Sequence, residues 1–591
     1  MSAIIPKSDN FNIQCSIQNA LGATSNKEIC YNTTVALIKA VASTVFSPLI
    51  NFGLMAEAAC SCRGSKAATH LINIFIDPIR SAITSAALSI ALIASPFFSL
   101  KGVNRLLPKI YDGVHELHNE KYNTILTQYK AQLGETLDSL ITEVKSYPQT
   151  NSIAKPLLEC LQSLTNTTDP RASYKRFVSK LDEVATFIEK NKLRTSSNYS
   201  TLRCIEIAET LAINRWAGVN MEDHFKERID LAEGKITEPQ LLSEFPSKLR
   251  DINHLVEHSS PAIKKSSASL AFQKLSGTAG VENFTGNRNT PNLLALMEYN
   301  KQDGSTQTIK YLRHGSPTHG KDFTLRNSSE GITPNYELFL YAAASRGQGV
   351  FYAIHQRLTS GGFDDESGRT KAILTLQKKH PNFHAMVQPV EGKFFNKTGS
   401  THFRNLFTEL QDEFFSNTDK PSCRLPSAVM YSLEYKTAFQ TIFKTVKETF
   451  FADNHILTET ERKQFILYFY ALQRMDLKMR LGETSNPISY YVTACKDDLD
   501  RGGSQALLEL VLHLIMTGQE NNPEQLSHLV NHLIGPPIVI KHIGMLSRRL
   551  EQVLPAIEYI IKNDEIMNKL KDLNFSGNTA KSVTFSGAAV A

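Results

Sequence analysis

The chain has 591 residues, too many for one hydrophobic core, so its length predicts two to four domains. Hydrophobic residues make up 41% and charged residues 21%, which are ordinary proportions for globular proteins and exclude wholesale disorder. The net charge of +6 suits a polyanionic ligand or an anionic membrane surface, but we expect no nucleic-acid partner, because the sequence has no zinc-finger spacing, no RNA-recognition aromatic motif and no long Lys/Arg block.

Two apolar stretches dominate residues 1–110. Residues 35–55 carry a single charge, Lys39, and residues 81–100 carry none over a length sufficient to cross a bilayer as a helix. Serines dilute the second stretch, and Pro96 would kink its end. We therefore expect two membrane-associating helices here, with a buried helical hairpin as the open alternative. The first residues lack a basic segment followed by an apolar one, so no secretory signal peptide is expected.

Residues 111–260 have the periodicity of a helical domain. Leu133, Leu137 and Ile141 recur at helical spacing, with charged residues between them. Such a domain offers a surface for a partner protein, which would be a host protein if the chain acts inside a host cell. Residues 259–278 have the composition of a linker.

Residues 261–575 alternate between strand and helix patterns, which is typical of an α/β domain with a central, mainly parallel sheet. Strands are expected at 308–312, 349–355, 384–390 and 428–433, and helices at 437–451 and 460–481. Residues 576–591 are small and polar, and we expect them to form a flexible tail.

The most informative segment of the sequence lies at 488–517. Residues 488–494 read as a buried strand and 505–517 as an apolar helix, so Cys495 and Arg501 bracket a five-residue loop. Loop amides at a helix N-terminus can bind a phosphate dianion, and Arg501 can grip two of its oxygens. The same positive field favours a Cys495 thiolate, the form that attacks phosphorus.

This loop resembles the signatures of three groups of phosphatases. The sequence Cys-Lys-Asp-Asp-Leu-Asp-Arg at 495–501 is similar to the Sac-domain phosphoinositide phosphatase motif C-x-D-C-L-D-R-T-N, which it matches at five positions: Cys495, Asp497, Leu499, Asp500 and Arg501. It also resembles the myotubularin loop C-S-D-G-W-D-R and the C-K-x-G-K-D-R loop of inositol phosphatases delivered by bacterial secretion systems. The resemblance covers about nine residues of the chain.

The resemblance implies a role for each loop residue. Cys495 would be the nucleophile, Arg501 the phosphate ligand and Asp497 the general acid. Because the only tryptophan, Trp216, is not followed by Pro-Asp, the sequence has no Trp-Pro-Asp acid loop, so an acid within the phosphate loop is needed. The remaining loop residues would contact the substrate: Lys496, Asp498, Leu499, Asp500, Gly502 and Gly503. The implied substrate is a phosphoinositide or a soluble inositol phosphate, and we expect neither a cofactor nor a metal.

Two alternatives remain open at this stage. The domain could bind phosphoinositides without hydrolysing them, because Gly502 replaces the Thr of these families and Asp498 adds a negative charge. The chain could instead be a histidine phosphatase, because Arg313-His314-Gly315 follows an expected strand. That mechanism needs a second histidine, for which the candidates are His355, His380 and His384. Arg313 and His314 could also contact a substrate phosphate.

The absence of a signal peptide, the apolar pair and the effector-like loop together favour a bacterial protein secreted into a host cell, where it would act at a membrane or in the cytosol. Otherwise we expect a cytoplasmic or membrane-associated protein. The eight cysteines include no C-x-x-C pair, which favours reduced thiols in a reducing compartment.

Overall fold

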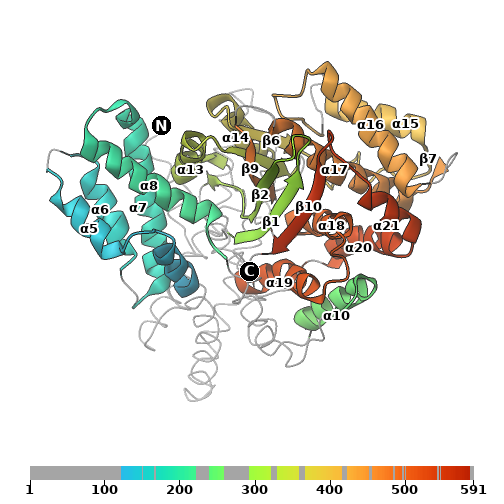
Figure 1. Ribbon diagram of the computed structural model, residues 1–591, viewed down its shortest axis with the longest axis horizontal. Coiled ribbons are helices and arrows are strands. Elements are labelled where there is room, and N and C mark those ends of the chain that lie inside the picture. The colour runs from blue at the N-terminus through green and yellow to red at the C-terminus, as the bar shows by residue number, and fades with distance from the viewer. Residues whose placement is uncertain are drawn as a thin grey trace, which may run out of the picture. The chain divides into compact units, whose positions relative to one another are not determined.

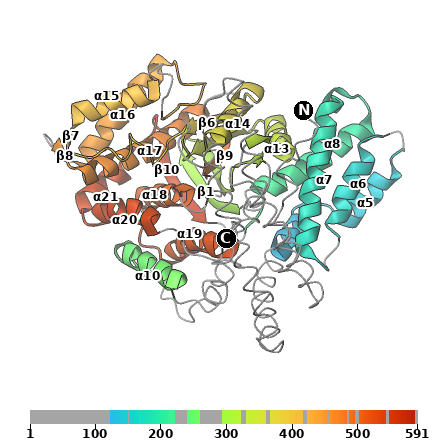
Figure 2. The same cartoon turned by 180° about the vertical axis from the view of Figure 1, so that it is seen from behind.

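The computed structural model describes most of the chain beyond residue 121 (Figures 1 and 2). The described residues are 122–148, 151–165, 168–220, 239–258, 292–320, 329–358, 366–415, 422–451, 456–482, 486–495, 498, 501–541, 545 and 547–585. All of them belong to one compact unit, His118–Ile263 with Thr285–Ala591. The apolar stretches expected within 1–110 and the linker expected at 259–278 lie outside the described residues.

A six-stranded mixed sheet forms the centre of this unit, with the strand order β10-β1-β2-β9-β5-β6. Its strands are β1 (Asn292–Asn300), β2 (Thr306–Arg313), β5 (Gly349–Ile354), β6 (Phe383–Val387), β9 (Ile488–Ala494) and β10 (Thr579–Phe585). Strands β2, β9, β5 and β6 are parallel to one another, while β1 pairs antiparallel with both β2 and β10. The expectation of an α/β region with a mainly parallel central sheet, preceded by helices, is confirmed.

The buried strands carry apolar side chains on both sides, so each face of the sheet is covered by helices. Tyr491 of β9 belongs to one hydrophobic cluster and its neighbours Tyr490 and Val492 to the other. The first face packs against α17 (Glu459–Gly482) and α18 (Arg501–Met516), with further helices beyond them. These are α10 (Phe245–His258), α15 (Phe403–Phe415), α16 (Leu433–Phe450), α19 (Pro523–Lys541), α20 (Ser547–Ile561) and α21 (Asp564–Lys571).

The second face packs against α13 (Pro334–Ser345) and α14 (Glu366–Lys379). Helices α5 (Leu137–Ser146), α6 (Ala154–Ser163), α7 (Pro170–Lys190) and α8 (Tyr199–Ala217) pack outside α13 and share one hydrophobic cluster with this face. The indole Nε1 of Trp216 in α8 donates to Asn335 Oδ1 at 2.6 Å, which fixes α8 against α13. Figure 1 shows these helices, in blue to cyan, on the side of the sheet opposite α17 and α18.

The short elements are η2 (Leu193–Thr195), η3 (Leu242–Glu244), the hairpin of β3 (Thr318–Gly320) with β4 (Ser329–Ile332), and the pair β7 (Thr401–His402) with β8 (Ile456–Leu457).

Two expectations about local structure are wrong. The strand expected at 428–433 is a turn leading into α16, because the Ser432 side chain accepts a hydrogen bond from Tyr435 N and caps that helix. The flexible tail expected at 576–591 contains β10, which pairs with β1 along the sheet edge. Val583 and Phe585 alternate on the buried face of β10, so a segment of small and polar residues still contributes a strand.

The chain order creates a topological switch point, the usual place for a site in such a sheet. After β2 the chain forms β5 and β6, and one strand position between β2 and β5 stays open. Strand β9, much later in the sequence, occupies that position. Open α/β sheets bind ligands outside the carboxyl ends of their strands at such a switch point. Arg313, His355, Gln388 and Cys495 lie at the carboxyl ends of β2, β5, β6 and β9, so these four positions meet at one edge.

Candidate active site at the carboxyl edge of the sheet

Cys495 directly follows the central strand β9 and is 5% exposed. Its position is fixed from two sides of the strand. The amide of His355 donates to the Ala494 carbonyl at 2.8 Å, and the Ser316 hydroxyl donates to the Cys495 carbonyl at 3.1 Å. The neighbouring strands therefore hold the backbone at the thiol rigidly.

Arg501 is the first residue of α18, and two carboxylates hold its guanidinium. One nitrogen donates to Glu366 Oε1 at 2.6 Å and another to Glu391 Oε2 at 3.2 Å. Burial alone would lower the pKa of Arg501, but the hydrogen bond that Arg501 donates to Glu366 and the charges of Glu366 and Glu391 raise it. Cys495 and Arg501 thus lie at the two ends of the segment that joins β9 to α18, and both side chains are buried.

The hydrogen bond between Arg501 and Glu366 lowers the pKa of the Glu366 carboxyl group. Burial would raise the pKa of Glu366, but the hydrogen bond and charge of Arg501 lower it to about 2. Glu366 Oε2 also accepts a hydrogen bond from the Arg357 amide at 3.3 Å. Glu366 is therefore an ionised, anchored partner that fixes one side of the Arg501 guanidinium.

Asp498 has a left-handed backbone conformation, with φ +55°, and its side chain is turned toward Arg313. Arg313 Nε pairs with Asp498 Oδ2 at 3.1 Å, in a setting where the two side chains are only 3% and 2% exposed. The other two guanidinium nitrogens of Arg313 donate to the backbone carbonyls of Asp498 and His532. All three nitrogens of Arg313 thus bind protein groups, and the geometry makes Arg313 a brace for the loop.

The brace explains both glycines at the start of α18. A Cβ atom at Gly502 would lie 1.8 Å from Asp498 Oδ1, and one at Gly503 would lie 2.9 Å from an Arg313 nitrogen. Position 502 therefore has no room for the Thr of the similar families, since the Asp498 carboxylate fills that space. In the sequence, Asp498 and Gly502 are two separate differences from the similar phosphatase motifs. In the structure they are linked, because the Asp498 carboxylate fits in this position only while residue 502 has no side chain.

His314 lies away from this cluster, in an aromatic one. Its ring is fully buried and packs edge-on against Trp216 and Tyr336, with centroid distances of 4.9 Å and 5.6 Å. Burial lowers the pKa of His314 to about 3, so the ring is neutral near pH 7. His355 and His380 are also buried, and burial lowers their pKa values to about 3 and about 4. Within the described parts of the chain, no hydrogen bond or ring contact joins His314 to either of them.

A buried charge cluster ties α18 to β9 beneath the loop. Glu509 of α18 accepts hydrogen bonds from Arg474 Nε at 2.8 Å and Tyr491 OH at 2.7 Å, and it also binds Lys478 Nζ. Burial would raise the pKa of Glu509, but the charges of Lys478 and Arg474 lower it to about 2. Arg474 also donates to the Gln388 side chain at 2.8 Å, so the cluster connects Tyr491 in the middle of β9 with the residue that follows β6.

Sequence reasoning missed Glu366, Glu391, Arg549 and the layer formed by Ser316, Gln356 and Arg369. Gln356 donates to the Ser316 hydroxyl at 3.0 Å and accepts from Arg369 Nε at 3.2 Å. These residues come from separate elements, and no short motif marks them. Of the predicted loop residues, Lys496, Asp497, Leu499 and Asp500 lie outside the described residues.

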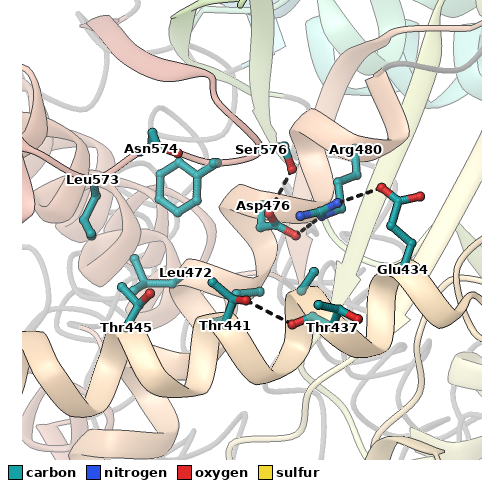
Figure 3. A pocket seen from close by; sticks show the side chains of 13 residues that line it. Glu434, Thr437, Thr441, Thr445, Leu472, Asp476, Arg480, Leu573, Asn574 and Ser576 are labelled. Atoms are coloured by element: carbon teal, nitrogen blue, oxygen red, sulfur yellow. Dashed lines mark hydrogen bonds and ion pairs between the residues drawn. The ribbon is translucent and has the colours of Figure 1, made fainter.

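A separate pocket of about 420 Å³ lies between α16, α17 and the segment before β10 (Figure 3). The charged side chains that line it bind one another. Asp476 binds Arg480 Nε at 2.6 Å and accepts from the Ser576 hydroxyl at 3.3 Å, and Arg480 also contacts Glu434 at 3.3 Å. None of the predicted site residues lines this pocket.

Comparison of the sequence with protein-family models finds no match, and neither the curated proteins nor the solved structures contain one. Among the described helices, none combines the length and apolar character needed to cross a bilayer. In the same portion of the chain, no three or more His, Cys, Asp or Glu side chains are grouped as metal ligands would be.

Proposed function

We propose that the chain is a cysteine-dependent phosphatase that hydrolyses phosphomonoesters of phosphoinositides or soluble inositol phosphates. The observation that carries the proposal is the placement of Cys495 directly after the central strand β9 and of Arg501 at the first position of α18. Both side chains are buried at the junction of a central parallel strand and the helix that follows, which is where a nucleophilic thiol and a phosphate-binding guanidinium are needed. The Arg313–Asp498 brace supports the proposal because it directs the extra carboxylate of the loop away from the phosphate-binding position and onto a counter-ion.

The proposed reaction has two steps. The Cys495 thiolate attacks phosphorus while Arg501 binds two phosphoryl oxygens, the bond to the inositol oxygen breaks, and Asp497 protonates that oxygen. The Asp497 carboxylate then takes a proton from water as the water attacks the phosphocysteine. The sulfur–phosphorus bond breaks, which releases inorganic phosphate and regenerates the thiolate.

Release of inorganic phosphate from a panel of phosphoinositides and inositol polyphosphates tests this proposal. We expect release by the native chain and none by Cys495→Ser, because a serine hydroxyl is not ionised at neutral pH. Cys160→Ser is the matched control, since Cys160 is also buried but lies in α6, where its thiol contacts the Phe177 carbonyl of α7. It should keep full activity. Equal release by the native and Cys495→Ser chains would disprove the mechanism.

A phosphoinositide-binding protein without hydrolytic activity is the second candidate. The observation that favours it is the occupation of Arg501 by two carboxylates, because these compete with a substrate phosphate. Binding of a phosphoinositide by the native chain, with no phosphate released from any substrate, would support this candidate.

A further inference from the structure

Glu391 bridges two arginines at the edge of the candidate site. It lies on the segment after β6, and its two carboxylate oxygens have different partners. Oε2 accepts a hydrogen bond from Arg501 at 3.2 Å, and Oε1 accepts one from Arg549, the third residue of α20. Two guanidinium groups from helices α18 and α20 therefore converge on one anionic group.

A phosphate group can replace a carboxylate in such an arrangement, because it also offers neighbouring oxygens to two guanidinium forks. We propose that Arg549 and Arg501 together form a two-arginine anion site, and that the Glu391 carboxylate holds the place of the phosphate while the site is empty. The inference rests on the proposed function in that it takes Arg501 as a ligand of the phosphoryl group. It adds Arg549 as a second ligand and Glu391 as an internal competitor.

The state of Arg549 supports this proposal. Its side chain is 4% exposed, and its Nε atom has no hydrogen-bond partner among the described residues. A buried, unpaired donor on a charged group is costly unless a ligand satisfies it. A carboxylate offers two oxygens to the pair of arginines, whereas a phosphate offers three. A bound phosphate can therefore satisfy donors that Glu391 leaves unpaired.

The two carboxylates on Arg501 differ in the freedom they have to move. Glu366 begins helix α14, accepts a second hydrogen bond from the Arg357 amide, and has a side chain that is 10% exposed. Glu391 lies outside helices and strands, and its side chain is 21% exposed. We therefore assign Glu366 to positioning Arg501 and Glu391 to occupying the anion site. This difference gives the two residues opposite expected effects on phosphate binding.

The affinity of the full chain for inorganic phosphate, measured by titration calorimetry, tests the inference. Glu391→Gln should bind phosphate about five- to tenfold more tightly, because the competing charge is removed. Arg549→Gln should bind about tenfold more weakly, with Arg549→Lys between it and the native chain, because lysine keeps the charge but loses the fork. Glu366→Gln should weaken binding, since Arg501 loses its anchor.

Arg250→Gln is the matched control. Arg250 also pairs with glutamates of α20, Glu551 and Glu558, but none of its described contacts involves the candidate site. It should leave the phosphate affinity unchanged. If Arg549→Gln fails to fold, as judged by its circular dichroism, Arg549→Lys and Glu391→Gln decide the question.

Each outcome separates the inference from the proposed function. Weaker or unchanged binding by Glu391→Gln would mean that Glu391 positions Arg501, and unchanged binding by Arg549→Gln would remove Arg549 from the site. Either result overturns the inference even if the chain releases phosphate from inositol phosphates. The expected pattern of affinities without phosphate release would uphold the anion site and refute the phosphatase. Failure of every chain to bind phosphate would refute both.

Discussion

At the residue scale, the site depends on a few side chains that restrict one another. The Asp498 carboxylate fills the space beside Gly502, Arg313 neutralises that carboxylate, and Gly503 leaves room for Arg313. The position of Asp498 is thus fixed by an ion pair with Arg313, a residue distant in sequence. Asp498 and Gly502 are therefore linked, because the space that a Thr at position 502 would need is occupied by an ion-paired carboxylate.

Gly502→Ala tests this packing directly. The added methyl group would lie 1.8 Å from Asp498 Oδ1, so the Arg313–Asp498 pair must shift. We expect the free energy of unfolding to fall by about 1–3 kcal/mol, the usual cost of overpacking, and phosphate release to fall with it. Urea unfolding measures the stability.

A double-mutant cycle with Arg313→Met provides the control for that prediction. If Gly502→Ala acts through the ion pair, the two substitutions together should cost less than the sum of their separate effects, because the second disturbs a pair that the first has already lost. Strictly additive losses would show that Gly502 acts independently of Arg313.

Local sequence predicted Cys495 and Arg501 for a physical reason. The strand pattern and the helix pattern on either side of the loop are each visible in a run of consecutive residues. The loop between them could therefore be located without tertiary information. Glu366, Glu391 and Arg549 contact Arg501 or each other across 110 to 158 residues of sequence. The spacing of apolar residues along the chain does not predict contacts between residues so far apart. The sequence around a single glutamate in a loop does not indicate which arginine it will bind.

At the element scale, β9 and α18 act as one rigid part. Glu509 connects them through Tyr491 and is held by Arg474 and Lys478 from α17, all with fully buried side chains or nearly so. The strand before residues 496–500 and the helix after them are therefore joined by the same charge cluster. The sequence predicted an almost wholly apolar helix over 506–516, with Glu509 and His513 as the two polar residues in that stretch.

Glu509→Gln should destabilise the chain strongly at neutral pH. It leaves the buried charges of Arg474 and Lys478 without a counter-ion, which typically costs about 3–5 kcal/mol. The pKa of Glu509 is lowered from its usual value of 4.5 to about 2 in the folded chain, so its ionised form contributes stability above pH 4.5. That contribution is lost as the pH falls from 4.5 to about 2.

The pH dependence distinguishes this mechanism from a simple packing defect. The difference in unfolding free energy between the native chain and Glu509→Gln, measured in urea at several pH values, should narrow as the pH falls below 4.5. Glu434→Gln is the control, because Glu434 pairs with Arg480 at an exposed position and should change stability by less than about 1 kcal/mol. A difference that stays constant from pH 7 to pH 2.5 would refute the electrostatic explanation.

At the scale of the whole molecule, the sequence predicted the order of helical and α/β regions but not how they meet. The side chains of α5 to α8 join the hydrophobic cluster of one sheet face, whereas α10, from the same expected helical region, packs on the opposite face. Periodicity identifies which residues of a helix are buried, but it does not identify the surface that buries them. The edge strand β10 was missed for a related reason, since its few apolar residues become informative only beside β1.

Residues 81–100 provide the last test, which concerns the expected membrane association. They lie outside the described residues, and the sheet and the candidate site are formed by residues 292–585, so we expect replacement of residues 81–100 to leave both intact. We expect that substitution of these twenty residues by a Gly/Ser linker of equal length will release the chain from anionic phosphatidylserine vesicles in a flotation assay, because the linker removes an apolar stretch of bilayer length. The thermal unfolding midpoint should remain within about 2 °C of the native value, since a change below about 1 kcal/mol shifts the midpoint of a large domain by that order. A chain that still floats with the vesicles would show that membrane binding arises elsewhere. A large drop in the unfolding midpoint would instead identify residues 81–100 as part of a protein core, the alternative that the serines and Pro96 left open.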